Sequence, residues 1–395
     1  MNIAFFINKF PNIGGVESVT VLLANHFQSK GHKVSIISFE QVDFSILNDL
    51  DKNVRLYYLS HPVTSIKNTL RFRKILIKNN INVIFNQWCL PFITSAFCRL
   101  AGLGVNCPII SIHHNAPNEN HRIRTCVEKL NRAESIFGKL KYKLLQYFWK
   151  FSTILSLQIT YLISAKYIVL SEAFIPLFLN FTGVLNKGKV EAIPNPLTIP
   201  IEPINLEEYF SHKNNEIIYV GRLEENQKKI KRILDIWKAV YQSNKNWKLK
   251  IIGDGPDKEM LESYVKNNKI EKVYFEGFQN PINYYRSAKI LMLTSDYEGF
   301  GLVITEAMAY GVVPLVYGSY DAIHDIIDNN VNGFILEKPF DVHQFIEKVN
   351  FLINNEAILR QCSLCSIEIK NKFSVEGVYN KWIDLLNRVI KHKLL

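Results

Sequence analysis

Long hydrophobic runs are absent from this sequence. No uncharged apolar stretch approaches the roughly 18 residues that cross a bilayer, and the longest candidate, residues 151–165, is too short. Residues 1–7 lack a basic n-region and a cleavage site, and polar Asn8 and Lys9 follow them. We therefore expect no transmembrane span, and a first buried strand instead of a signal peptide.

Paired cysteines and metal-binding motifs are scarce. Of six cysteines, only Cys362 and Cys365 have CxxC spacing, and no second pair or histidine partner completes a zinc site. No Asp-x-Asp motif follows an expected strand. The sequence therefore predicts free thiols in a reducing compartment, with neither a metal nor another cofactor.

Acidic residues are few in the first half of the chain. Residues 1–200 carry 22 Lys and Arg against 10 Asp and Glu, whereas residues 201–395 carry 25 against 26. A uniformly basic nucleic-acid-binding protein would not have its charge so unevenly distributed, and no recognisable nucleic-acid motif is present. We therefore expect no nucleic-acid partner.

One basic segment, residues 139–150, interleaves lysines with leucines and aromatic residues. This mixture is typical of an interfacial amphipathic helix that faces an anionic membrane surface. The alternative is an ordinary surface helix that packs its leucine and tryptophan side chains inward.

Short apolar segments alternate with helical segments along the chain, which predicts a parallel, doubly wound sheet and an α/β fold class. The strands expected in the first half are residues 3–7, 33–38, 83–85, 109–112 and 167–170. A proline-rich passage, residues 193–203, then interrupts the pattern, and the alternation restarts at Glu216. At 395 residues, the chain is expected to form two Rossmann-like domains, residues 1–200 and 201–374, that face a central cleft.

A glycine pair, Gly14 and Gly15, follows the first expected strand and opens a helix, so a substrate could approach the backbone amides there. The segment lacks the G-x-G-x-x-G spacing of dinucleotide sites, and no Walker lysine follows. An oxidoreductase or a P-loop enzyme is therefore a poor interpretation. The alternative is a simple tight turn.

Two carboxylates, Glu298 and Glu306, bracket a glycine-rich turn between a short buried strand and an apolar helix. Ligands of open α/β sheets collect at the carboxyl ends of strands. Glu306 could accept two hydrogen bonds from a ribose diol, and the helix dipole favours an anion at the turn. The amides expected to face that anion belong to Gly299, Phe300, Gly301, Leu302 and Val303. In the alternative, Glu298 caps the helix and Glu306 lies on a solvated face.

A second segment suits a pyrophosphate. The expected strand at residues 216–220 leads to Arg222, and Lys228 and Lys229 follow near the same sheet edge. Arginine offers a planar fork of donors and lysine a point charge. The alternative, for Lys229 and Lys231 more than for Arg222, is the solvated start of a basic helix.

Two other strand ends carry polar or glycine-rich sequences. His113 and His114 end a strand, where a histidine is by default a hydrogen-bonded structural residue. The turn at residues 253–256, Gly-Asp-Gly-Pro, follows a later strand and is interpreted as structural.

Taken together, these motifs resemble glycosyltransferase family 4, the retaining nucleotide-sugar enzymes of the GT-B fold. The resemblance covers nearly the whole chain and is closest to bacterial enzymes that build surface polysaccharides such as O-antigen or capsule. It is carried by Gly14-Gly15-Val16-Glu17, His113-His114-Asn115, Ile193-Pro194-Asn195-Pro196, Gly221-Arg222-Leu223 with Gln227-Lys228, Gly253-Asp254-Gly255-Pro256, and Glu298 to Glu306. It also implies that the last helix, within residues 375–395, returns to the first domain.

The resemblance implies transfer of a sugar, with retention, from a nucleotide diphosphate sugar to a hydroxyl of a lipid-linked saccharide. A UDP-sugar is favoured over a GDP-sugar, and the enzyme is expected in the cytoplasm, peripherally attached to the inner face of the membrane. The catalytic residues implied are Glu298, Arg222, Lys228 and His114.

Each of these residues has an implied role. Arg222 and Lys228 neutralise charge on the leaving diphosphate in place of a metal. Glu298 binds the donor sugar, and His114 contacts it from the opposite domain. Glu306 holds the ribose, while Gly14 and Gly15 contact the donor phosphate and the acceptor.

Two departures from the family pattern leave details open. An extra residue between Arg222 and Lys228 makes Lys229 a competitor for the phosphate. The segment 317–321 replaces a commoner double glycine and leaves the floor of the sugar pocket unassigned.

Two other functions fit the same fold. One is a non-catalytic polysaccharide- or membrane-binding protein, although the arginine, the lysine and both glutamates are all present. The other is a sugar-nucleotide epimerase, which needs no lipid acceptor and would leave residues 139–150 without a purpose.

Overall fold

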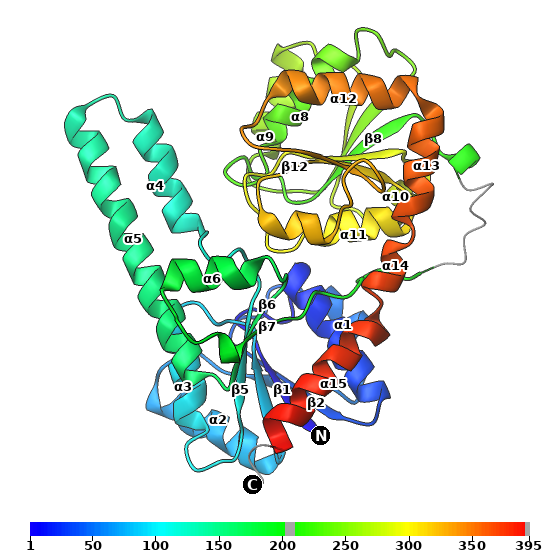
Figure 1. The fold of residues 1–395 in the computed structure, drawn as a ribbon. Helices are drawn as coiled ribbons and strands as arrows, with labels where there is room; N and C mark the ends of the chain where they lie inside the picture. Colours follow the sequence, from blue (N-terminus) through cyan, green and yellow to red (C-terminus); the bar gives the residue numbers. More distant parts are fainter. Residues whose placement is uncertain (202–209, 392–395) are drawn as a thin grey trace. The chain divides into compact units, whose positions relative to one another are not determined.

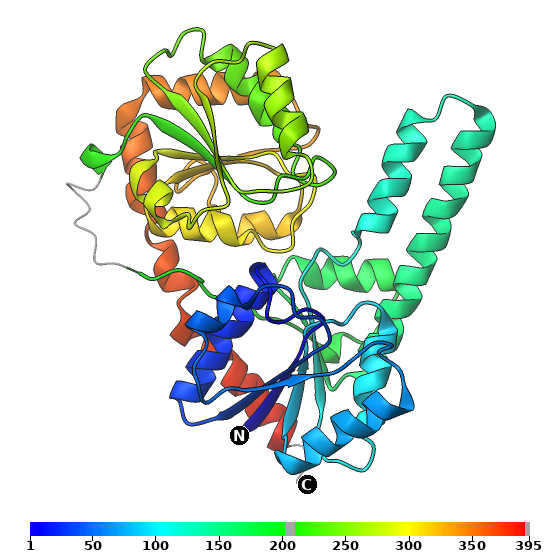
Figure 2. The same cartoon turned by 180° about the vertical axis from the view of Figure 1, so that it is seen from behind.

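The computed structural model describes residues 1–201 and 210–391 (Figures 1 and 2). The chain divides into two compact units, Met1–Thr198 together with Ser374–Leu395, and Ile199–Phe373. Each unit is built on a parallel sheet with helices between successive strands. The α/β class and the doubly wound sheets expected from the sequence are therefore confirmed.

The first unit contains a sheet in the order β3-β2-β1-β4-β5-β6-β7. Its strands are β1 Asn2–Phe6, β2 Lys33–Ser38, β3 Arg55–Tyr58, β4 Val83–Asn86, β5 Ile109–His113, β6 Lys166–Val169 and β7 Val190–Ala192. The chain runs from β1 through β2 to β3 at one edge, and then returns to β4 on the other side of β1 and continues to the opposite edge. Strands β1 and β4 therefore flank the topological switch point.

Helices connect these strands. They are α1 Gly15–Ser29, α2 Ile66–Lys78, α3 Phe92–Ala101, α4 His121–Arg132, α5 Ile136–Ile163, α6 Phe174–Thr182 and α15 Val375–Lys391, with 3-10 turns η1 Phe44–Asp49 and η2 Lys187–Lys189. Between this sheet and its helices lies a core of phenylalanines, in which Phe6, Phe72 and Phe97 have ring centroids 5.5–5.7 Å apart.

The second unit has a sheet in the order β10-β9-β8-β11-β12-β13. The strands are β8 Glu216–Val220, β9 Lys248–Ile252, β10 Val273–Gly277, β11 Ile290–Leu293, β12 Val313–Tyr317 and β13 Phe334–Leu336. The helices are α8 Ile230–Val240, α9 Lys258–Asn267, α10 Ile282–Ser287, α11 Leu302–Ala309, α12 Val342–Asn354, α13 Glu356–Ser366 and α14 Ile369–Lys372, with turns η3 Phe210–His212 and η4 Asp321–Asp325.

The last helix, α15, belongs to the first unit, although the second unit precedes it in the chain. It packs against α1, where Lys30 Nζ lies 2.8 Å from a carboxylate oxygen of Glu376. Tyr379 covers Phe27 with ring centroids 5.3 Å apart. These contacts join the C-terminal segment to the N-terminal sheet.

Helices α4 and α5 form a two-helix arm that extends away from the first sheet (Figure 1). Near its base, the Arg122 guanidinium lies 4.4 Å from the centre of the Trp149 ring. Leu140 and Leu144 are 54% and 61% exposed, so the alternative in which this segment packs its leucines inward does not hold for these two, whereas Leu145 and Trp149 are half-buried. Among residues 1–201 and 210–391, no helix is both long and apolar enough to span a membrane.

Candidate active site

The sheet of the second unit places two of the expected site segments next to each other. Strands β8 and β11 are neighbours, and the chain continues from β8 toward one edge of the sheet and from β11 toward the other. The loops that follow these strands therefore flank the topological switch point, where open α/β sheets bind ligands.

Lys228 and Glu298 meet across these two loops. Lys228 Nζ lies 2.5 Å from Glu298 Oε1, and the two side chains are 17% and 12% exposed. The residue that precedes the first turn of α11 is Gly301, and no side chain caps that helix. The alternative in which Glu298 serves as a helix cap is therefore wrong.

Glu306 lies inside α11 and is buried. Its Oε2 accepts a 3.0 Å hydrogen bond from the hydroxyl of Tyr285, a fully buried residue at the end of α10. Burial, and then the Glu306 carboxylate, raise the pKa of the Tyr285 hydroxyl well above its usual value, so it remains a donor. The solvated-face alternative for Glu306 is wrong, and nothing in the sequence indicated Tyr285.

The glycine-rich turn before α11 has a backbone conformation that requires glycine. Gly301 has φ +95°, and a Cβ atom there would lie 2.6 Å from the Tyr320 hydroxyl oxygen. The Phe300 ring is buried against Phe373, with centroids 5.3 Å apart. Phe300 therefore has only its main chain to offer a ligand, and the first amides of α11 follow directly.

Arg222 is the most accessible of the expected cations, with a side chain 68% exposed. Its Nε lies 3.6 Å from a carboxylate oxygen of Glu224. The carbonyl of Arg222 accepts a 2.9 Å hydrogen bond from Tyr219 in β8, so the main chain is fixed while the guanidinium extends into solvent.

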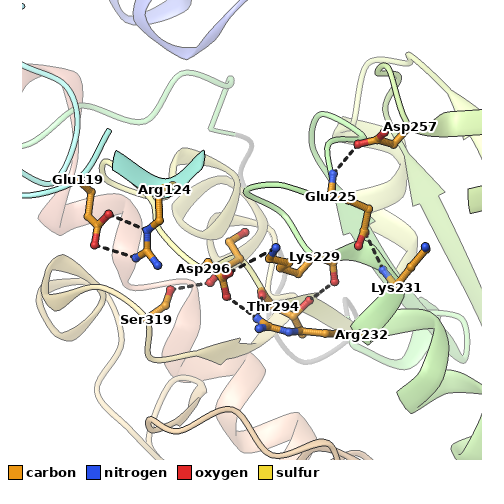
Figure 3. Close-up of polar contacts among 11 residues, drawn as sticks. Glu119, Arg124, Glu225, Lys229, Lys231, Arg232, Asp257, Thr294, Asp296 and Ser319 are labelled. Carbon is orange, nitrogen blue, oxygen red and sulfur yellow. Dashed lines mark hydrogen bonds and ion pairs between the residues drawn. The ribbon is translucent and has the colours of Figure 1, made fainter. Parts of the chain in front are cut away.

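Lys229 faces Asp296 (Figure 3) and not Glu298, the partner of Lys228. Its Nζ lies 3.6 Å from Asp296 Oδ2, while Arg232 Nη1 lies 2.6 Å from the other oxygen of Asp296. Thr294 donates a 3.0 Å hydrogen bond to the carbonyl of Lys229, whose φ of +52° is left-handed. Lys229 is thus part of a network that ties the start of α8 to the end of β11, and it is not a solvated lysine.

The turn at Gly253 and Gly255 is a packing element, as expected. A Cβ at Gly253 would lie 1.9 Å from the carbonyl oxygen of Gly221, and one at Gly255 would lie 2.4 Å from that of Leu223. These glycines allow the loops after β8 and β9 to approach each other closely.

In the first unit, His113 and His114 differ in their surroundings. His113 is buried in β5, and its Nδ1 shares a 2.9 Å hydrogen bond with the Tyr167 hydroxyl. Burial lowers the pKa of His113 to about 4 and that of His114 to about 3, with the neighbouring His113 adding to the latter shift. Both rings are therefore neutral at pH 7. His113 is structural, whereas His114 lies just beyond the strand.

The glycine pair before α1 has a carboxylate folded over it. A Cβ at Gly14 would lie 2.4 Å from Glu17 Oε2, and Asn12 donates a 3.2 Å hydrogen bond to the other oxygen. Burial raises the pKa of the Glu17 carboxyl. Sequence reasoning identified the glycines but gave no role to Glu17.

Cations and carboxylates thus alternate at one sheet edge of the second unit, an arrangement that suits a ligand bearing both phosphates and hydroxyls. Across residues 1–201 and 210–391, no group of three or more His, Cys, Asp or Glu side chains is arranged to hold a metal.

Known proteins resemble this chain along nearly its full length. An uncharacterized glycosyltransferase of Haemophilus influenzae is 27% identical, with 97% of this chain and 99% of that protein covered. A Campylobacter jejuni α-1,4-N-acetyl-D-galactosaminyltransferase, named for an undecaprenol-linked saccharide, is 24% identical, with 98% and 99% covered. The structure of Anabaena HepE with UDP and glucose has the same fold, with a TM-score of 0.74 at 15% identity and coverage of 98% and 100%.

Two family models divide the sequence between them. Residues 13–199 match Glycosyltransferase Family 4, and residues 203–365 match Glycosyl transferases group 1. Together with the two Rossmann-like sheets, these matches show that the chain belongs to the GT-B glycosyltransferases that combine these two domains.

Proposed function

We propose that the protein is a retaining glycosyltransferase of bacterial surface polysaccharide synthesis. It transfers a sugar from a nucleotide diphosphate sugar, with UDP favoured, to a hydroxyl of a lipid-linked saccharide. Two comparisons support these details: the Anabaena structure contains UDP and glucose, and the name of the Campylobacter relative specifies a saccharide on an undecaprenol carrier.

The second unit supplies most of the proposed donor site. Arg222 and Lys228 stabilise the negative charge that grows on the diphosphate as it leaves, the electrostatic effect that dominates many such reactions. Glu298 shares the Lys228 ammonium and binds hydroxyls of the donor sugar. The two oxygens of Glu306 accept hydrogen bonds from the ribose diol, and the amides of residues 299–303 face the phosphates.

Retention is proposed from the resemblance to family 4. The acceptor oxygen attacks the anomeric carbon on the face from which the diphosphate departs. The bond from that carbon to the phosphate oxygen breaks, the new glycosidic bond forms, and the acceptor proton passes to the leaving phosphate. Glu298 already neutralises Lys228, which suits a binding role better than that of a nucleophile. The contact of His114 with the sugar stays a prediction.

The observation that carries the proposal is the 2.5 Å contact between Lys228 and Glu298, beside the switch point of the second sheet. A panel of UDP- and GDP-sugars would test it, with thermal stabilisation first and product analysis second. Stabilisation by one donor, followed by its slow hydrolysis or transfer, is the expected result. An epimerised nucleotide sugar, or a complete absence of turnover with every donor, would contradict the transferase.

We also propose that the arm attaches the enzyme to the cytoplasmic face of an anionic membrane. Helix α5 contains four lysines and no acidic residue. Large apolar side chains on it are 54–78% exposed, at Phe137, Leu140, Leu144, Tyr147, Phe148 and Phe151. Their spacing of three and four residues places them on one stripe of the helix. Lysines next to such a stripe can reach lipid headgroups while their stems cover apolar surface.

Vesicle binding tests this attachment. Vesicles of phosphatidylglycerol and phosphatidylethanolamine should bind the protein, and raised salt should weaken the binding. A Leu144→Ser/Phe151→Ser variant should lose roughly tenfold or more in affinity because buried apolar area is removed. Phe44→Ser removes a side chain that is 60% exposed outside the arm and is the matched control. Equal binding of both variants would disprove the role of the stripe.

A further inference from the structure

A cavity of about 180 Å³ lies at the base of the arm, within the first unit. It is half open to solvent and is lined by α4, α5 and α6 together with the residues that lead into α4. The side chains that face it belong to Asn118, Glu119, Ile123, Arg124, Val127, Gln146, Lys150 and Phe181. None of these residues belongs to the site proposed above for the donor.

A carboxylate is held rigidly at the rim of this cavity. Arg124 donates from Nε to Glu119 Oε2 at 2.6 Å and from Nη2 to Glu119 Oε1 at 2.8 Å, a two-pronged ion pair (Figure 3). Such a pair fixes the carboxylate plane, and each oxygen keeps a lone pair for a further donor.

The neighbouring polar groups are not used by the protein. Among the described residues, the side chains of Asn118, Gln146 and Lys150 have no hydrogen-bonding partner, although none of them is fully exposed. The two amides can both donate and accept, and the ammonium donates. A ligand rich in hydroxyl groups would satisfy all three together with the Glu119 carboxylate.

The remaining walls are apolar. Ile123 is buried, and Val127 and Phe181 are half-buried. A cavity of roughly 150 Å³ admits a benzene ring, so this one has room for a single six-membered ring. Aliphatic and aromatic walls with a few convergent polar groups suit a pyranose, which has C–H faces and a hydroxyl edge.

The walls are also held in place before any ligand arrives. Asn120 accepts a 3.0 Å hydrogen bond from the amide of Ile123 and donates one of 2.9 Å to Thr153 on α5. This contact joins the start of α4 to α5 next to the cavity. A preformed site loses little entropy on binding.

We propose that this cavity binds one pyranose ring of the saccharide acceptor, with Glu119, Gln146 and Lys150 as the hydrogen-bonding groups. The inference rests on the proposed function, because it takes the acceptor to be a saccharide. Gln146 and Lys150 lie on α5, the same helix that carries the exposed apolar stripe. A sugar held here would therefore lie beside the helix that faces the lipid, where the head of a lipid-linked saccharide is found.

Saturation-transfer NMR with water-soluble methyl glycosides tests the site without a membrane. The probes are the methyl α-glycosides of glucose, galactose, N-acetylglucosamine and N-acetylgalactosamine, added to the full chain. At least one should bind at millimolar concentration. Gln146→Leu and Lys150→Met should each weaken it about five- to tenfold through the loss of one hydrogen bond, whereas Lys78→Met, at an exposed lysine on α2, should not.

Different results would contradict the sugar site and the proposed transferase. If the wild-type protein binds UDP but none of the glycosides, or if Lys150→Met and Lys78→Met bind glycoside equally, the cavity is not a sugar site. If the glycoside binds as expected but no nucleotide sugar is bound or turned over, the transferase proposal fails and the sugar site stands. UDP affinity, measured in parallel, should be the same for the wild type, Gln146→Leu and Lys150→Met.

Discussion

Lys228 and Glu298 lie 70 residues apart in the sequence, and their side chains approach to 2.5 Å at the edge shared by β8 and β11. Both are largely withdrawn from solvent, so neither charge is balanced mainly by water. A phosphate arriving beside Lys228 would meet an ammonium that is already oriented by a carboxylate.

Removal of this ammonium should act mainly on turnover. We expect Lys228→Ala to lower kcat by about 10²–10³-fold, the usual effect of removing one group that stabilises transition-state charge. The affinity for UDP should change much less. Steady-state kinetics of donor hydrolysis, with calorimetric titration of UDP, measures both quantities.

Lys229→Ala is the matched control for Lys228→Ala. Lys229 contacts Asp296, which Arg232 also holds at 2.6 Å, so its loss leaves that carboxylate paired. We expect less than about a tenfold effect on kcat, since the Lys229 ammonium contacts Asp296 and not the Lys228–Glu298 pair. Equal losses in the two variants would show that the phosphate is bound by both lysines or by neither.

Tyr285 should increase the affinity for the nucleotide by orienting the Glu306 carboxylate. Tyr285→Phe removes the 3.0 Å hydrogen bond that orients the Glu306 carboxylate. We expect the Kd for UDP to rise about fivefold, the equivalent of one hydrogen bond, with kcat at saturating donor unchanged. Glu306→Ala should raise the same Kd further.

The control is Tyr264→Phe, which removes a 2.7 Å hydrogen bond to Asp235 on α8. Calorimetric titration with UDP compares the three variants. An unchanged Kd in Glu306→Ala would end the ribose assignment. A fall in kcat without a change in Kd for Tyr285→Phe would mean that the tyrosine acts on the reaction and not on the nucleotide.

The sequence predicted the central strands well because a strand buried on both faces is a continuous apolar run. The strand expected at residues 216–220 is β8, with the same bounds. The strands β3 and β7 were missed. They are edge strands of three or four residues whose side chains are mostly half-buried, so neither an apolar run nor an alternation marks them.

The site was predictable only where local pattern and ligand chemistry coincide. A glycine-rich turn between a strand and a helix pointed to Glu298 and Glu306, and cations that follow a strand pointed to Arg222 and Lys228. Tyr285 lies 21 residues before Glu306, and their contact arises from tertiary packing alone, so no local signal could have found it. The cavity at the base of the arm likewise needs three helices that are separated in the sequence.

His113 and His114 in the first unit should make the stability of the protein sensitive to acid. Their pKa values are about 4 and about 3, against an ordinary value of 6.5, because burial disfavours the charged rings. Below pH 6.5 the unfolded chain therefore binds protons that the folded chain does not, so the free energy of unfolding falls as the pH decreases toward 4.

Urea titrations at pH 7.5 and pH 5 would measure this loss. The wild-type protein should lose more stability between these two pH values than His114→Gln, which has no imidazole to protonate at that position. An equal loss in both proteins would show that His114 does not contribute.

At the turn before α11, both the left-handed backbone of Gly301 and the lack of space around it favour glycine. The two effects can be measured separately. Gly301→Ala should destabilise the protein by the cost of a left-handed alanine, about 1–2 kcal/mol, and by an added clash with the Tyr320 hydroxyl, which a Cβ would meet at 2.6 Å. Gly277→Ala is the matched control, because Gly277 also has a positive φ, +71°, but nothing lies within 4 Å of its added Cβ.

The double variant Gly301→Ala/Tyr320→Phe isolates the clash. Removal of the Tyr320 oxygen should lower the cost of Gly301→Ala toward that of Gly277→Ala. Any cost that remains above that of Gly277→Ala comes from Ile304, whose Cδ1 the added Cβ would meet at 3.0 Å. Urea denaturation of the wild type, Gly301→Ala, Tyr320→Phe and the double variant gives the coupling energy directly. If the two substitutions are strictly additive, the Tyr320 hydroxyl does not contribute to the cost of Gly301→Ala.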